Sequence, residues 1–233
     1  MTSYPPIDSG LEVDRRFPDS DGQPMADNTE QFQWIVLIKE NLEVLFADDP
    51  NVFVAGDLLW YPVPSQLVSP TAPDVMVSFG RPKGRRGSYK QWQEDDIAPQ
   101  VVFEILSPSN TKAKMDLKLE FYETYGVEEY YLYDPETFRL EGWLRQGEHL
   151  NKLWQMNDWV SPRLGIRFDT TSQRELVLYR PDGQRFLTTI ERERQMTQER
   201  QRAEQERQKA EQLANYLRSI GVDPDNLPTE RPE

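Results

Sequence analysis

The sequence lacks cysteine altogether and contains a single histidine, His149. The absence of cysteine excludes disulfide scaffolds, thiol nucleophiles and thiolate zinc sites, and nothing in it indicates an oxidising compartment. One histidine cannot build a site that requires two. A metal ion would therefore have to be held mainly by oxygen atoms, which favours magnesium, calcium or manganese.

Long apolar runs are also absent. The most apolar stretch of the N-terminal third runs from Trp34 to Ile38, whereas a helix that spans a bilayer needs about 20 apolar residues. The sequence begins Met1-Thr-Ser-Tyr-Pro-Pro, which has neither the basic region nor the apolar region of a secretion signal. These features predict a cytoplasmic protein with no membrane partner.

Basic residues are fewer than acidic ones, 27 against 40, which gives a formal net charge of −13. An acidic chain disfavours nucleic-acid binding, because duplex binding draws much of its affinity from Lys and Arg side chains that neutralise phosphates. One segment departs from this average: it contains five cations and no acid. We predict a nucleic-acid-binding loop here, with a solvated surface loop as the alternative; its cations are Arg81, Lys83, Arg85, Arg86 and Lys90.

The chain divides into three parts by composition. Residues 1–26 are rich in Pro, Asp and Ser and show no periodicity, which predicts an extended N-terminal arm. Residues 27–190 carry the helical and strand patterns of a core domain. Residues 191–233 are dominated by Glu, Gln, Arg and Lys with a near-heptad repeat, which predicts a charged coiled-coil-like helical tail that could assemble a homo-oligomer.

Within the core, apolar residues at helical spacing predict a first helix that starts at Asp27 or Asn28 and stops before Pro50. A second helix is expected over residues 112–125, where Gly126 suits its C-terminal end. Antiparallel hairpins are expected between Phe138 and Leu187. The order of elements predicts an α/β or α+β fold with a mixed sheet and flanking helices; its early strands are expected at 52–55, 57–61, 74–79, 100–106 and 128–134, with loops at 63–73 and 80–97.

Glu104 is the first candidate for chemistry. Side chains alternate along residues 101–106, so Glu104 shares one face of the strand with Val102 and Leu106, and both faces are otherwise apolar. A carboxylate in such a place needs a cation, a hydrogen-bond network or a raised pKa. The alternative is a glutamate at the strand end that reaches solvent or a structural arginine.

Two further residues could join Glu104. Asp74 begins another apolar run, and two carboxylates on neighbouring strands could converge on one divalent ion, although a Pro-Asp pair is also common turn punctuation. Lys118 lies on the apolar stripe of the second helix between Met115 and Tyr122. Its ammonium could point at the metal site, or the side chain could simply extend along the surface to water.

Four ordered segments together resemble a known family. They resemble the Uma-type restriction endonucleases, which belong to the PD-(D/E)xK nuclease superfamily, and the resemblance covers roughly residues 27–190. Members often carry a charged coiled-coil tail. The segments are Ala72-Pro73-Asp74-Val75-Met76-Val77, Val101-Val102-Phe103-Glu104-Ile105-Leu106-Ser107, Asp116-Leu117-Lys118-Leu119-Glu120-Phe121-Tyr122 and Gly126-Val127-Glu128-Glu129-Tyr130-Tyr131-Leu132-Tyr133-Asp134-Pro135.

The resemblance implies a restriction-endonuclease-like core and a metal site. Asp74 and Glu104 would hold magnesium or manganese, and the backbone carbonyl of Ile105 would supply a further ligand. The superfamily often has an acid on the first helix, a place that Glu30 fills here. The sequence departs from the superfamily signature at Leu106, where the signature has lysine.

The resemblance implies that Lys118 replaces this lysine from the neighbouring helix. Hydrolysis of a phosphodiester needs a nucleophilic water, neutralisation of charge at phosphorus and help for the leaving oxygen, which acids, a metal ion and a lysine can provide. The sequence therefore predicts a metal-dependent endonuclease that acts on nucleic acid, with DNA as the expected substrate.

Other readings of the same residues remain. The fold could be catalytically silent and serve as a module that binds nucleic acid or protein, or it could be a structural scaffold. A Ser-His-Asp site would have to use His149, which lies in an expected hairpin turn with no serine motif nearby. Tyr130, Tyr131 and Tyr133 alternate along a strand and are expected to pack in the core rather than to stack on bases.

Overall fold

The computed structural model describes residues 16–22, 25–172 and 175–224. The boundary between two compact units falls between Phe186 and Leu187. The first unit contains a sheet with helices against it, and the second contains one long helix. Within the described residues, no helix combines the length and the apolar character that a membrane crossing requires.

The first unit is built on a mixed sheet with strand order β1-β3-β5-β6-β7-β8. Neighbouring strands are antiparallel except for β5 and β6, which are parallel and are joined through a helix. A parallel neighbour requires such a crossover, whereas the antiparallel pair β7 and β8 needs only a tight turn at Gly147. The expected mixed α/β fold is confirmed; the strands are β1 (Val52–Gly56), β3 (Val75–Phe79), β5 (Val101–Ile105), β6 (Glu129–Asp134), β7 (Arg139–Gln146) and β8 (His149–Lys152).

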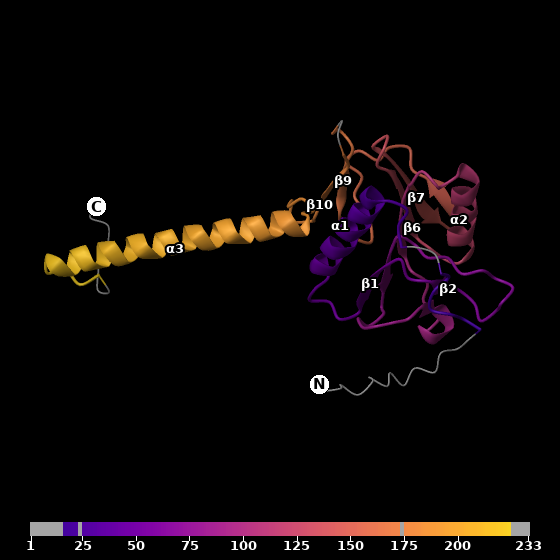
Figure 1. Ribbon diagram of the computed structural model, residues 1–233, viewed down its shortest axis with the longest axis horizontal. Helices are drawn as coiled ribbons and strands as arrows, with labels where there is room; N and C mark the ends of the chain where they lie inside the picture. The colour runs from indigo at the N-terminus through magenta and orange to yellow at the C-terminus, as the bar shows by residue number, and fades with distance from the viewer. Residues whose placement is uncertain (1–15, 23–24, 173–174, 225–233) are drawn as a thin grey trace, which may run out of the picture. The chain divides into compact units, whose positions relative to one another are not determined.

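Two helices lie on opposite sides of this sheet, α1 (Thr29–Leu45) and α2 (Lys112–Thr124) (Figure 1). Each begins where its sequence offers a cap, because the side chains of Asn28 and Thr111 accept hydrogen bonds from backbone N–H groups of the first turn. Helix α2 stops at Gly126, whose φ of 97° is readily adopted by glycine alone. Both helices therefore start and end as the sequence predicts.

The alternation along β5 divides the core into two layers. Val101, Phe103 and Ile105 belong to the apolar cluster on the α1 side, and Val102 belongs to the cluster on the α2 side. Glu104 consequently faces α2. The small sheet of β9 (Arg167–Asp169) and β10 (Val177–Tyr179) closes the α1 layer, to which Phe168 and Leu178 contribute.

Two expectations about the segments between strands were wrong. The strand expected at 57–61 is reduced to β2 (Trp60–Tyr61), because Asp57 adopts a left-handed conformation with φ of 47° that interrupts extended backbone. The segment expected to be a loop, 80–97, contains β4 (Tyr89–Lys90) and the short helix η1 (Gln91–Gln93). Strand β4 pairs in parallel with β2.

The N-terminal arm is anchored where the structure describes it. Phe17 is buried, and its ring lies 5.3 Å from that of Tyr61 and 4.9 Å from that of Trp92. The Tyr61 hydroxyl donates to the Pro18 carbonyl at 2.6 Å. The rest of the expected arm, residues 1–15 and 23–24, lies outside the described residues.

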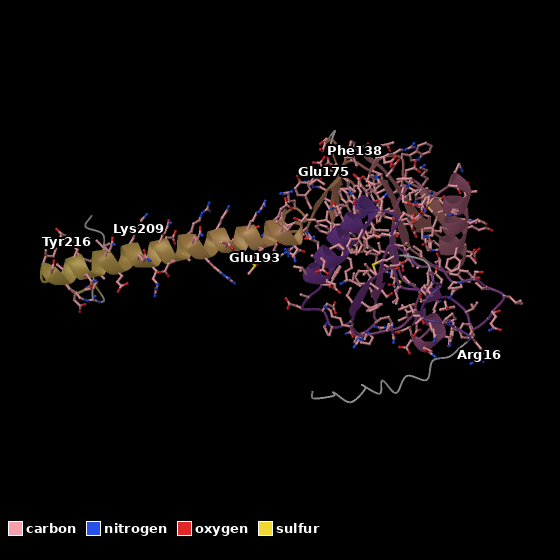
Figure 2. The ribbon with its side chains drawn as sticks, in the orientation of Figure 1. Arg16, Phe138, Glu175, Glu193, Lys209 and Tyr216 are labelled. Atoms are coloured by element: carbon pink, nitrogen blue, oxygen red, sulfur yellow. The ribbon has the colours of Figure 1, made fainter. Side chains whose placement is uncertain are left out.

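The second unit consists mainly of α3 (Thr189–Ser219). Thr188 and Glu191 form a capping box at its start, and none of its residues is buried. Figure 2 shows the side chains of Glu193, Lys209 and Tyr216 along its length. Its polar composition explains why it has no core of its own, since its large apolar residues are few and none is buried.

We expect residues 27–190 to fold without the tail. A chain that ends after Ile190 should keep a single cooperative thermal transition, because α3 buries no side chain. Calorimetry compares this chain with the full-length protein, and light scattering gives the mass per particle of each. Loss of the transition would contradict the domain boundary, and an equal number of copies per particle would remove the tail from any role in assembly.

Candidate active site

Asp74 lies just before β3, at the edge where β5 ends. The register of β3 and β5 pairs Val75 with Phe103, which brings Asp74 beside the last residues of β5. Its Oδ2 accepts a hydrogen bond from the Ile105 backbone N–H at 2.6 Å. The side chain is buried, with 6% of its surface exposed, so the strand end holds this carboxylate in one place.

Glu104 projects from β5 into the space between the sheet and α2. It is 3% exposed, and both of its carboxylate oxygens accept hydrogen bonds from Lys118 Nζ at 2.8 Å. The Tyr122 hydroxyl donates to Oε1. Lys118 and Tyr122 are four residues apart on α2, so one face of the helix supplies both donors. The structure therefore brings together the three residues that sequence patterns selected, Asp74, Glu104 and Lys118.

Burial and neighbouring charges shift the pKa values of Asp74 and Lys118. Burial, reinforced by the neighbouring Glu104, raises the pKa of Asp74 to about 8. Burial lowers the pKa of Lys118, but the carboxylates of Glu104 and Asp74 outweigh it, and the net effect is a raised pKa. Lys118 is thus a charged ammonium. A bound cation would stabilise the charged form of Asp74, which burial and Glu104 disfavour.

Gln31 of α1 completes the cluster and was missed by the sequence analysis. Its Nε2 donates to the Ile105 carbonyl at 3.1 Å and contacts Asp74 Oδ2 at 3.5 Å, while its Oε1 accepts from the Asp27 N–H at 2.8 Å. Two oxygens, one from Asp74 and one from Ile105, therefore converge on a single point. Glu30, the expected acid of this helix, is solvent-exposed, and among the described residues Gln31 is the α1 side chain in contact with Asp74.

Asp57 is a second residue that the sequence did not reveal. Its backbone N–H donates to the carbonyls of Pro73 and Asp74 at 3.1 and 3.2 Å, which places it directly beside the site. Burial, together with the charge of Asp21, raises its pKa to about 6. No pattern in the sequence distinguishes this aspartate from an ordinary turn residue, because its position depends on how β1 and β3 pair.

Three cations of the loop that is predicted to bind nucleic acid have partners outside the cluster. Arg81 and Arg86 both donate to Glu94, at 2.9 and 2.6 Å, and these bonds outweigh burial to hold the pKa of Glu94 below its usual value. Lys83 Nζ donates to the carbonyls of Phe46 and Ala47, beyond the C-terminal end of α1. Gln31 lies at the other end of this helix, which is about 25 Å long.

Three of the five loop cations therefore have structural partners. Of the other two, Arg85 is exposed and Lys90 is half-buried in β4. His149 lies at the hairpin end of β8, where it contacts Glu123 at 3.3 Å. A Ser-His-Asp site finds no support there.

The Tyr122 hydroxyl is a positioning group for Glu104, and we expect Tyr122→Phe to show it. Tyr122 is fully buried, so the variant removes one hydrogen bond to a buried carboxylate and should lower the free energy of unfolding by about 2 kcal/mol. Urea denaturation measures this difference. Tyr125→Phe, at the C-cap of the same helix and only partly buried, is the matched control and should change stability by less than about 0.5 kcal/mol. Equal stability of the two variants would contradict the role.

The donor atoms fit a hard divalent cation. Asp74 and Glu104 offer carboxylate oxygens and Ile105 offers a carbonyl oxygen. Within the described part of the chain, no group of three Asp, Glu, His or Cys side chains is close enough to enclose a metal ion. This set suits magnesium, which is commonly held by one or two carboxylates together with water and substrate phosphates.

A mixed sheet between helices, with an aspartate and a glutamate at the ends of neighbouring central strands and a lysine over them, defines a restriction-endonuclease-like nuclease domain. A family model described as "Uma2: Putative restriction endonuclease" matches residues 21–172. The chain belongs to this family, which confirms the resemblance seen in the sequence and supports a nuclease function.

One solved structure to which the chain is similar is a "putative nuclease" from Anabaena variabilis. It is 16% identical to this chain, and the match covers 60% of this chain and 74% of that one, with a TM-score of 0.43. No curated protein matches the chain.

Proposed function

We propose that this protein is a magnesium- or manganese-dependent endonuclease that hydrolyses phosphodiester bonds of DNA. The observation that supports it most is the cluster itself. Asp74, Glu104 and the Ile105 carbonyl lie at one edge of the sheet, and the charged Lys118 stands over Glu104. Family membership supports the nuclease class, and the oxygen donors support a divalent metal ion as cofactor.

In this proposal Asp74 and Glu104, with the Ile105 carbonyl, hold the metal ion. Bound there, a divalent ion would neutralise phosphate charge and lower the pKa of a nucleophilic water. The Tyr122 hydroxyl donates a hydrogen bond to Glu104 and fixes its orientation, whereas the Gln31 amide occupies the point on which the Asp74 and Ile105 oxygens converge and would give way to the ion. Such preorganisation matters because a site that is already oriented need not reorganise during the reaction.

Lys118 acts as a hydrogen-bond donor and fixed positive charge in this proposal. Its raised pKa keeps the ammonium protonated near neutral pH, so the side chain cannot accept a proton from water. It can stabilise negative charge that develops on the phosphoryl oxygens. Besides Glu104, the ammonium contacts the Ala72 carbonyl at 3.4 Å, and 26% of the side chain is exposed.

A catalytically silent module that binds nucleic acid or protein is the second candidate. One observation favours it: Arg81, Lys83 and Arg86, expected to hold phosphates, are engaged within the fold. The net charge of −13 also weakens attraction to nucleic acid. This candidate keeps the same fold but requires no cleavage.

Plasmid cleavage separates the two candidates. Purified full-length protein is incubated with supercoiled DNA and Mg²⁺ or Mn²⁺, and with the same DNA in EDTA. We expect conversion to nicked and linear circles only when metal is present, because a closed circle can be opened only by internal cleavage. A gel shift without any cleavage across DNA and RNA substrates would support the silent module instead.

A further inference from the structure

Trp154 lies on the surface of the first unit, in the segment that follows β8, and its side chain is fully exposed. The residues beside it are fixed. Leu153 donates its backbone N–H to the Gly142 carbonyl at 2.8 Å, and Leu153 and Met156 both pack against the apolar cluster on the α1 side. A Cβ added to Gly142 would lie 2.7 Å from Met156 Sδ and 3.1 Å from Leu153 Cδ1, so this glycine lets both side chains pack closely against β7. The segment therefore presents Trp154 to solvent from an anchored backbone.

Trp154 lies at the same edge of the sheet as the candidate active site. Leu153 is opposite Gly142 on β7, and the register through β6 places both level with Phe103 of β5. Strand β8 runs in the same direction as β5, so the residues that follow, Trp154 and Glu104, both lie toward this edge. Three strand spacings, about 14 Å, separate the two positions.

A second exposed aromatic residue, Phe138, lies at this edge in the turn between β6 and β7 (Figure 2). Its φ is 58°, in the left-handed region that glycine, asparagine and aspartate adopt more readily than phenylalanine. Phe138 thus disfavours its own turn and adds nothing to the core. Both aromatic residues border one open hollow of about 360 Å³. Their exposure and their shared hollow indicate a binding surface rather than packing.

The hollow also carries a surplus of positive charge. Its lining contains two cations and one acid, since Arg139 and Lys152 both pair with Glu141, at 2.6 and 2.5 Å. The two cationic side chains are 69% and 50% exposed, so both can approach a phosphate. Glu136, in the neighbouring turn, is exposed but does not line the hollow. Exposed rings beside exposed cations suit single-stranded nucleic acid, because bases stack on the rings while phosphates contact the cations.

We propose that Trp154 and Phe138 stack on unpaired bases of the strand that is cleaved at the candidate active site, while Arg139 and Lys152 contact its phosphates. The inference rests on the proposed nuclease function and specifies its substrate as nucleic acid with unpaired bases close to the cleaved bond. A base inside a duplex presents no free face, because the neighbouring base pairs cover it. A protein partner fits less well, because a stable protein interface buries about 800 Å² on each side and the apolar surface here consists of two rings.

The test uses full-length protein in Mg²⁺ and a fluorescein-labelled oligodeoxynucleotide with a cleavage-resistant phosphorothioate backbone. Fluorescence anisotropy gives the dissociation constants of the single strand and of the fully paired duplex of the same sequence. We expect wild type to bind the single strand at least about tenfold more tightly, because only its bases are free to stack. Equal binding of single strand and duplex would overturn the inference.

Trp154→Ala should weaken binding of the single strand about five- to 100-fold, the range for the loss of one stacked base, and should leave duplex binding unchanged. Trp154→Phe keeps an aromatic ring and should retain most of the affinity. Neither variant should lower the unfolding temperature, because the side chain is fully exposed. Tyr216→Ala, which removes an exposed aromatic side chain from α3, is the matched control and should bind as wild type does.

Phe138→Gly separates binding from stability. Glycine adopts a φ of 58° readily, so the variant should keep or raise the unfolding temperature while it weakens binding of the single strand. A purely structural Phe138 would show the opposite, a lower unfolding temperature with unchanged binding.

Equal binding of the single strand by wild type, Trp154→Ala and Phe138→Gly would overturn the inference and leave the two rings as a protein-docking surface. Plasmid cleavage is scored separately. Cleavage by wild type without an effect of the aromatic variants on binding overturns only this inference, and the expected binding without any cleavage overturns only the nuclease function.

Discussion

Lys118→Met is expected to lower DNA cleavage by about 10²- to 10³-fold, the effect of removing one electrostatic stabiliser from an active site. Methionine keeps most of the stem volume and the helix propensity but removes the ammonium, which donates to both oxygens of Glu104 at 2.8 Å. Initial rates on supercoiled plasmid at saturating Mg²⁺ measure the loss.

The structure adds an expected loss of stability to this loss of cleavage. A lysine that merely extends to water could be replaced without cost, but Glu104 is 3% exposed and would lose its cation. Lys118→Met should therefore also destabilise the fold by about 3 kcal/mol, the lower end of the range for a broken buried pair, because Lys118 itself is partly exposed.

A second substitution separates catalysis from stability. Adding Glu104→Gln to Lys118→Met removes the unpaired charge and should restore most of the stability without restoring cleavage. Lys114→Met, on the exposed face of the same helix, changes the net charge equally and should cleave as wild type does. Cleavage by Lys118→Met within threefold of wild type would exclude Lys118 from the chemistry.

The Asp74→Asn, Glu104→Gln double variant is expected to lose the thermal stabilisation that Mg²⁺ or Mn²⁺ gives to wild type. A metal ion that binds only the native state adds about 2.7 kcal/mol at a concentration 100 times its dissociation constant, and the two carboxylates are its side-chain ligands in this proposal. The metal-free variant should be less stable than wild type, because Glu104→Gln leaves the ammonium of Lys118 without its carboxylate partner. Differential scanning fluorimetry over a metal titration measures both effects.

A control variant checks that this response is local. Asp48→Asn, Glu136→Gln removes the same number of charges from exposed positions, and its response to metal should match that of wild type. An unchanged metal response in the Asp74→Asn, Glu104→Gln variant would place the metal elsewhere.

The sequence predicted the parts of the site that follow from strand and helix periodicity. An acid between apolar neighbours in β5 implied a cation, a hydrogen-bond network or a raised pKa. The apolar stripe of α2 pointed to Lys118, and the structure pairs Lys118 with this acid. The alternation of β5 also indicated correctly that Glu104 faces away from Phe103 and Ile105. Local patterns of this kind depend only on side-chain direction within one element.

Features that depend on register or on distant partners could not be predicted. On a helix one residue corresponds to about 100° of rotation, so choosing Glu30 instead of Gln31 selected the exposed side of α1. Asp57 reaches the site only through the pairing of β1 with β3.

The loop cations show the same limit. The segment from Arg81 to Lys90 contains no acid, yet Arg81 and Arg86 are paired with Glu94, four residues beyond its end. The charges within one segment of sequence do not reveal an acidic partner that the fold brings close from outside that segment.

The central claim is that Asp74, Glu104 and the Ile105 carbonyl form one metal site beside Lys118. Anomalous diffraction from crystals of the full-length protein grown with Mn²⁺ tests it most directly, because the signal locates the ion without reference to activity. The expected result is a peak in coordination contact with Asp74, Glu104 and the Ile105 carbonyl, with Gln31 displaced from the point on which their oxygens converge. Strong peaks elsewhere, with this position free of anomalous signal, would contradict the account.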